Sequence, residues 1–158
     1  MDTLVEEALS DKDWVSCVED LLNRPEVMRM KDFTHHKNTT CFEHCVHVSY
    51  LSYKFLENRG IDGRSVARIG LLHDLFLYQR EELHSRIRRI THLFTHGKRA
   101  LLNAENITEL TKKEQRAIAR HMFPLTIIPS ISKEGMLICL YDKVCCFREL
   151  TNKWQEVA

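Results

Sequence analysis

Residues 70–76 read GLLHDLF, an apolar run interrupted by an adjacent histidine and aspartate. Asp62 can cap a helix that leads into this run through apolar residues at helical spacing. A polar pair in such a segment costs free energy unless it has a partner. Because neighbouring helical residues differ by about 100° in direction, His73 and Asp74 at the helix end can coordinate one ion from two directions. A lone His-Asp pair is common by chance, so its surroundings decide.

The rest of the chain predicts helices almost throughout. Only five glycines and three prolines occur in 158 residues, which favours helices over a turn-rich β fold. Capping boxes at Thr40–Glu43 and Thr111–Glu114 predict the beginnings of two helices. Gly60 and Pro124 are expected to end them.

Three further helical segments are expected. One follows an N-cap within residues 10–13 and ends at Pro25. Residues 77–95 predict a loop with a short helix at 86–94, and a separate helix follows around 100–104. In the last long helix, Asp142 is expected within an apolar stripe formed by Met136, Leu140, Val144, Phe147 and Leu150. We therefore predict an all-α, single-domain helical bundle over residues 1–158, with segment 1–30 packed on a motif-bearing core at about 33–150.

Composition excludes several functions. A formal net charge of +1 and a pI of about 7.7 create no strong field for nucleic acid or an anionic membrane. No apolar run approaches the roughly 18 residues of a membrane span, and the start lacks the features of a signal peptide. The six cysteines include no CxxC pair, so we expect reduced thiols that pack rather than bind metal. These features predict a cytoplasmic protein, and they leave its oligomeric state open.

Other histidines and aspartates follow the central pair in a definite order. His44 lies upstream, while His96, His121 and Asp142 follow downstream. This series resembles the extended His, His-Asp, His, His, Asp pattern of the HD-domain superfamily of metal-dependent phosphohydrolases. The flanking residues are similar too, as in RHMFPL at 120–125. The chain looks closest to small bacterial HD-domain proteins that have no assigned substrate.

The resemblance implies two metal ions. The first would be held by His44, His73, Asp74 and Asp142, and the second by His96 and His121 with Asp74 bridging. Four imidazoles and two carboxylates suit iron, manganese, cobalt, nickel or zinc better than calcium or magnesium. Two ions roughly 3.5–4 Å apart could share a hydroxide and stabilise an in-line displacement.

Further residues are candidates for catalysis or substrate binding. His92 lies four residues before His96, so both could face the site. We expect His96 to be the ligand, in the family's manner, and His92 to be either a catalytic or substrate contact or a surface residue. His36 could close over the pocket or be an ordinary loop residue, and His47 is expected to pack rather than to orient a ligand.

Cations that could meet a phosphate are Lys143, Lys98 and Arg80. Lys143 follows a presumed ligand, a position that the family often fills with lysine, and is a catalytic candidate beside Asp74. Lys98 and Arg80 are substrate-binding candidates, although the sequence favours a surface role for both. No lysine follows Asp74 within five residues, as one does in some family branches, so the catalytic details of those branches are not transferred.

The leading functional hypothesis is hydrolysis of a small phosphate ester, such as a nucleotide or another phosphorylated metabolite. Two alternatives remain open. Some HD-type proteins with a similar ligand set are di-iron oxygenases, and a metal-retaining sensor or partner-binding domain would use the same residues without catalysis. Substrate specificity would depend on the segments 77–95 and 122–132.

Overall fold

The computed structural model describes residues 2–36, 38–56, 60–77 and 86–151. Within these ranges the regular elements are helices, apart from one short antiparallel hairpin in which Thr34 pairs with Thr40. The elements are α1 (Thr3–Ser10), α2 (Lys12–Leu22), α3 (Pro25–Arg29), the 3₁₀ helix η1 (Met30–Asp32), β1 (Thr34–His36), β2 (Thr39–Thr40), α4 (Cys41–Lys54), α5 (Gly63–Leu72), α6 (Arg86–Ile107), α7 (Lys112–Arg120) and α8 (Lys133–Thr151). The predicted all-α fold is confirmed.

Local capping chemistry explains where several helices begin. At the start of α4, the Thr40 backbone N–H donates to Glu43 Oε2 at 2.8 Å, and the Glu43 N–H donates back to Thr40 Oγ1 at 3.2 Å. Thr111 and Glu114 form the same pair of bonds at the start of α7. Asp62 caps α5 by accepting a hydrogen bond from the Ser65 N–H. Both predicted capping boxes are therefore confirmed.

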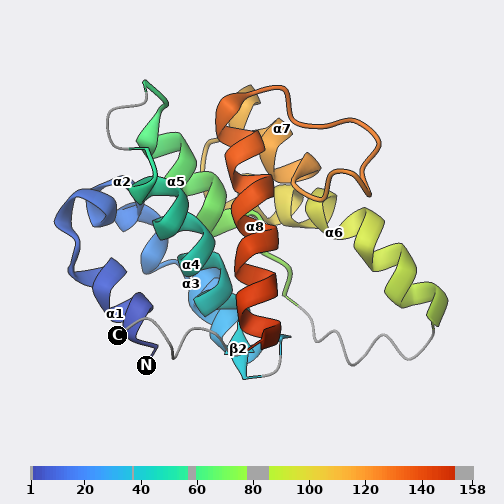
Figure 1. Ribbon diagram of the computed structural model, residues 1–158, viewed down its shortest axis with the longest axis horizontal. Helices are drawn as coiled ribbons and strands as arrows, with labels where there is room; N and C mark the ends of the chain where they lie inside the picture. The colour runs from blue at the N-terminus through green and yellow to red at the C-terminus, as the bar shows by residue number, and fades with distance from the viewer. Residues whose placement is uncertain (1, 37, 57–59, 78–85, 152–158) are drawn as a thin grey trace.

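Helices α4 and α5 lie at the centre of the molecule, and α8 packs against both (Figure 1). The two central helices approach closely because residue 70 has no side chain. A Cβ atom at Gly70 would overlap the Ser49 backbone. Ser49 Oγ donates to the Ala67 carbonyl at 2.7 Å and accepts from Trp14 Nε1 at 3.0 Å, which links α2 to this contact.

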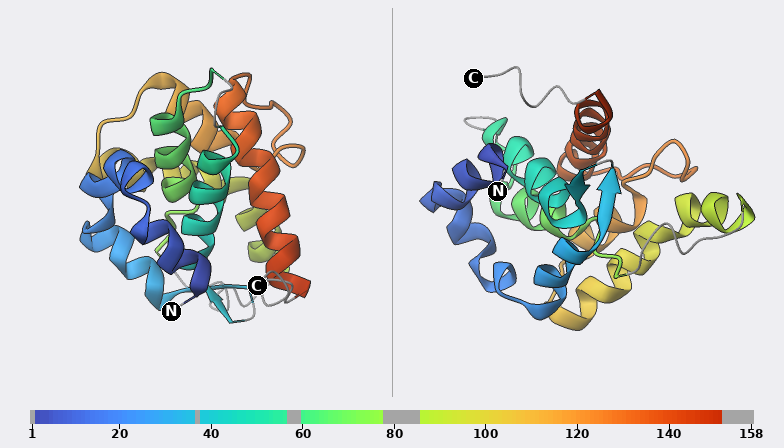
Figure 2. Two further views of the ribbon diagram at one scale, coloured as in Figure 1. Left: turned by 60° about the vertical axis from the view of Figure 1, so that its left-hand side comes forward. Right: turned by 90° about the horizontal axis from the view of Figure 1, so that it is seen from below.

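The remaining helices flank this centre on two sides (Figure 2). Helix α1 packs against α2 and α4, and α2 against α5, through buried residues that include Val5, Trp14 and Leu21. On the other side, α6 packs against α7, and α7 against α8. None of the described helices is long and apolar enough to cross a bilayer.

Helix α6 differs from the sequence prediction. It runs unbroken from Arg86 to Ile107, whereas we expected a short helix and a separate one after it. Gly97 does not interrupt it, because the missing side chain serves packing: a Cβ there would lie 3.1 Å from the carbonyl oxygens of Ile118 and Ala119 on α7. The N-terminal part of α6 extends away from the rest of the bundle (Figure 1).

Helix α8 buries the face opposite to the predicted one. The expected apolar stripe points outward, with Met136 61% and Phe147 62% exposed. Asp142 does not lie in that stripe but on the opposite, buried face, together with Glu149 and Cys145. The prediction was wrong because it oriented the helix by hydrophobicity alone. Glu149 accepts a hydrogen bond from His44 of α4, and Asp142 Oδ1 lies 3.3 Å from the same ring, so this polar face is the buried one.

Candidate metal centre

All six predicted ligands converge in the interior of the bundle, from three helices and the C-terminal ends of two others. His44 comes from α4, His96 from α6 and Asp142 from α8, whereas His73 and His121 are the C-caps of α5 and α7. Asp74 follows His73 directly. None of the six side chains belongs to a residue that is more than 4% exposed. Such a buried set of ionisable groups requires strong compensating partners.

The first group of ligand atoms lies between α4, α5 and α8. His44 Nε2 and His73 Nε2 lie 3.3 Å and 3.7 Å from the same atom, Asp142 Oδ1. The three ligand atoms fall within 4.8 Å of one another, as a metal site requires. Neither Nε2 atom makes a hydrogen bond, although both are buried. The two imidazoles therefore direct unsatisfied nitrogen atoms at one point.

The second group lies between α5, α6 and α7. His96 Nε2 and His121 Nε2 are 3.3 Å and 3.4 Å from Asp74 Oδ1 and 3.0 Å from each other. Asp74 Oδ1 is buried and makes no hydrogen bond. The other oxygen, Oδ2, lies 3.2 Å from His35 Nε2 and 4.0 Å from His73 Nε2. Asp74 thus presents one oxygen to each group, as a bridging carboxylate does.

Hydrogen bonds at Nδ1 fix the orientation of three of these rings. His73 Nδ1 donates to the Gly70 carbonyl at 2.7 Å, and His121 Nδ1 donates to the Ile118 carbonyl at 2.8 Å. Since a carbonyl oxygen only accepts, the proton must lie on Nδ1, which leaves Nε2 free to bind an ion when the ring is neutral. Metal-ligating histidines are held by the same type of bond.

Glu149 provides the equivalent bond for the remaining ring of the first group. Its Oε1 accepts from His44 Nδ1 at 2.8 Å, and its Oε2 accepts from His35 Nδ1 at 3.2 Å. Glu149 is only 2% exposed. The sequence analysis missed this residue, although it lies two helical turns after Asp142 and so shares its face of α8.

His35 is a second residue that the sequence analysis missed. Its Nε2 lies 3.2 Å from Asp74 Oδ2, and its ring stacks on that of His44 with centroids 3.8 Å apart. We had considered His36 instead. Because adjacent strand residues point to opposite faces, the pattern could have indicated that one of the two histidines faces the centre.

The charges of the centre compensate one another. Burial alone would raise the pKa values of Asp74 and Asp142, but neighbouring histidines hold both well below the ordinary range. Burial alone would lower the pKa of His44, but Glu149 and Asp142 hold it well above its ordinary value. Burial would also lower the pKa of His73, but Cys45, Asp74 and Asp142 around the ring hold it well above its ordinary value. Buried histidine and aspartate groups of this kind could bind a metal ion.

The predicted cations occupy different positions. Lys143 lies at the edge of the centre: its Nζ is 3.9 Å from Asp142 Oδ2 and donates to the Cys139 carbonyl at 3.1 Å. Lys98 is not brought to the centre. It is exposed and follows His96 by two residues, about 200° around the helix. It lines a pocket of about 590 Å³ with Phe94 and Arg116.

Three candidates fall outside what the structure describes. Arg80 lies outside the described residues, and so do the side chains of His36 and His92. His47, which we expected to pack, is buried but also makes polar contacts: Nε2 lies 3.3 Å from Asp2 Oδ1, and Nδ1 lies 3.6 Å from Glu149 Oε1.

Comparison with known proteins adds no assignment. No protein-family model matches the chain, and searches of curated proteins and of solved structures found no significant match. The functional argument therefore depends on the chemistry of the centre.

Proposed function

We propose that this chain is a metal-dependent phosphohydrolase of the HD type, which acts on a small phosphate ester such as a nucleotide at a dinuclear site. The observation that carries the proposal is the position of Asp74. One of its oxygens lies with His96 and His121, and the other faces His73. A carboxylate shared between two clusters of imidazole nitrogens is suited to bridging two ions.

The unsatisfied atoms support metal binding over a purely structural cluster. The Nε2 atoms of His44 and His73 and Oδ1 of Asp74 are buried without a hydrogen bond. Leaving such atoms unpaired costs about 1–3 kcal/mol each, and a bound ion would remove that cost. The nitrogen and oxygen set fits iron, manganese, cobalt, nickel or zinc.

Two ions would act as Lewis acids and lower the pKa of a bound water, which is the chemistry that phosphoester hydrolysis requires. The chain itself would orient the ligands through Glu149 and through the carbonyls of Gly70 and Ile118. Lys143, at the edge of the centre, would place a positive charge near the transferred phosphoryl group.

Metal analysis followed by an activity panel tests this proposal. Metal-free protein is loaded separately with iron, manganese, cobalt, nickel and zinc, and its ion content and phosphate release from nucleotides and p-nitrophenyl phosphate are measured. We expect two ions per chain and hydrolysis that Asp74→Asn abolishes. Oxygen uptake by the iron form without phosphate release would instead assign an oxygenase. Bound ions with neither activity would assign a binding domain.

A further inference from the structure

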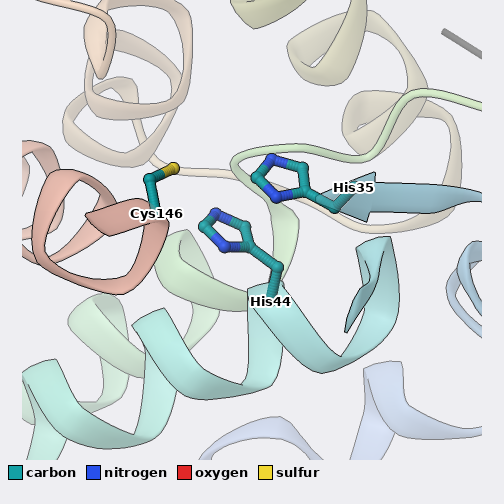
Figure 3. A group of neighbouring side chains, drawn as sticks. All are labelled: His35, His44 and Cys146. Carbon is teal, nitrogen blue, oxygen red and sulfur yellow. The ribbon is translucent and has the colours of Figure 1, made fainter. Parts of the chain in front are cut away.

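A third group of ligand atoms lies beside the first metal position and includes a cysteine. His35 Nε2 or Nδ1, a His44 ring nitrogen and Cys146 Sγ fall within 4.8 Å of one another. Figure 3 shows the two imidazoles face to face, with the thiol of α8 beside the His44 ring. We propose that His35, His44 and Cys146 form a second, softer ligand set that captures a thiophilic ion such as zinc or cadmium and thereby blocks the first metal position.

The two imidazoles have the same partner at Nδ1 and differ at Nε2. Their rings are nearly parallel, at 19°, and each Nδ1 bonds to a different oxygen of Glu149. Both rings therefore direct Nε2 away from Glu149. His35 Nε2 is hydrogen-bonded to Asp74 Oδ2 at 3.2 Å, and capture of an ion would exchange that bond for one to the ion. His44 Nε2 is fully buried and makes no hydrogen bond. This unsatisfied nitrogen indicates a ligand site even without considering Cys146.

The ligand atoms of the soft set lie near enough for one ion to join them. The two ring nitrogens and Cys146 Sγ fall within 4.8 Å of one another, and the thiol is at present 3.5 Å from Asp142 Oδ1. An ion bonds imidazole nitrogen at about 2.0–2.1 Å and thiolate sulfur at about 2.3 Å, so two such ligands span at most roughly 4.4 Å. Capture of an ion would thus need only a small contraction of the group.

The soft set and the first metal position exclude each other. Glu149 occupies His44 Nδ1, so His44 offers one nitrogen, and that nitrogen binds one ion at a time. His44 with His73 and Asp142 gives an N₂O set, whereas His44 with His35 and Cys146 gives an N₂S set. Thiolate selects zinc and other soft ions, and carboxylate favours harder ones such as manganese. The identity of the ion would therefore decide which set His44 joins.

Only a thiolate and an unprotonated ring nitrogen bind metal. Capture would therefore release to solvent the Cys146 proton and the proton that His35 Nε2 donates to Asp74 Oδ2. No oxidant or reductant takes part. The loss of activity that capture would cause rests on the proposed function, whereas capture itself does not.

Spectroscopic titration tests the soft set without an activity assay. Metal-free protein is titrated with Cd²⁺ and, separately, with Co²⁺, while thiolate-to-metal charge-transfer absorption and ion content are recorded. We expect this absorption in the wild type, its loss in Cys146→Ser and its weakening in His35→Gln. Cys139→Ser is the matched control, since Cys139 is a half-buried thiol of the same helix, and it should retain the absorption.

Alkylation gives a check that needs no variant. Iodoacetamide labelling with peptide mapping should show that Cd²⁺ protects Cys146 and leaves Cys139 unchanged. Binding of Cd²⁺ without charge-transfer absorption, absorption that survives in Cys146→Ser, or a lack of protection would each overturn the soft set while leaving the metal centre intact. Failure of the wild type to bind any ion would overturn both proposals.

An activity arm connects the two proposals. Cd²⁺ should inhibit the manganese-loaded wild type at a concentration at least about tenfold lower than it inhibits Cys146→Ser, a difference that corresponds to about 1.4 kcal/mol. Equal inhibition of both forms would show that capture has no effect on the first position.

Discussion

Glu114 and Asp74 are both buried carboxylates, but their oxygens have different surroundings. Glu114 Oε2 accepts hydrogen bonds from the backbone and hydroxyl of Thr111 at 2.8 Å and 2.9 Å, and its Oε1 accepts from Ser65 Oγ at 3.2 Å. Asp74 Oδ1, by contrast, makes no hydrogen bond and faces the ring nitrogens of His96 and His121.

The difference separates a structural carboxylate from a candidate ligand. Both oxygens of Glu114 have ordinary donors, so the group is complete as it stands. At Asp74 one buried oxygen has no ordinary donor and faces two imidazoles, so a bound positive ion would complete the group. Burial of a carboxylate is common to both places, and the oxygen without a hydrogen bond distinguishes the candidate metal centre.

The largest effect should come from the centre itself. We expect His73→Ala and Asp74→Ala each to abolish ion binding at the first position and to reduce hydrolysis to the uncatalysed background. Ion content and phosphate release measure this. Glu114→Gln is the matched control, because both oxygens of Glu114 already have hydrogen-bond donors. This variant should keep the wild-type ion content and rate of phosphate release. Full ion content and rate in either alanine variant would show that the assignment is wrong.

Removing the ions should destabilise the whole fold. At a hundredfold excess over its dissociation constant an ion stabilises the native state by about 2.7 kcal/mol, or roughly 5–10 °C in Tm for a domain of this size. Calorimetry of metal-loaded and chelator-treated protein measures the difference in Tm. This difference should be smaller in Asp142→Asn than in the wild type. Superimposable melting curves after verified metal removal would mean that the ions do not hold the helices together.

The two halves of the centre should be separable. His121→Ala is expected to lower the content from two ions to one, because His121 lies in the Asp74 Oδ1 group and not in the Asp142 group. Elemental analysis decides the point. Loss of both ions, or of neither, contradicts a two-position arrangement.

Glu149 should have a smaller effect, because it would act through His44 and His35 rather than on an ion. We expect Glu149→Gln to weaken ion affinity at the first position by about 10- to 100-fold. Glu134→Gln, a carboxamide change at another buried carboxylate of α8, controls for a general effect on the helix. Equal affinities for Glu149→Gln and wild type would remove Glu149 from the centre.

The smallest effect should come from Thr111, which donates hydrogen bonds to the Glu114 carboxylate. Thr111→Ala removes a helix cap, which costs about 1 kcal/mol of unfolding free energy. Denaturant titration measures this cost, and the ion content should stay at the wild-type value. A change in ion content would show that the Glu114 region and the centre are coupled.

The sequence predicted those features that depend on neighbours along the chain. The capping boxes at 40–43 and 111–114 are local bonds between residues three apart, and both are present. The His-Asp pair and its companions were identified by order and type. The structure brings all six together, although binding of an ion by them stays a prediction.

Long-range contacts account for what the sequence did not predict. His35 and Glu149 are 114 residues apart, so their bond leaves no periodic signal. The orientation of α8 was wrong for the same reason: its apolar residues suggested one buried face, and partners on α4 selected the other. The continuity of α6 was missed because the segment 77–95 predicted a loop with a separate short helix, whereas α6 runs through Gly97, which contacts α7.

Gly70 would look unimportant in a search for functional groups, yet a mutational scan should rank it with the ligands. Its carbonyl accepts the Nδ1 proton of His73, and its bare Cα allows α5 to touch Ser49 of α4. Even an added methyl group would separate the helices that carry His44 and His73. Substitutions at this position would therefore change the distance between His44 and His73, and their effect on activity would show how strictly the centre requires that distance. In selection experiments glycine should be the one residue tolerated at position 70, although it has no side chain that could bind an ion or take part in a reaction.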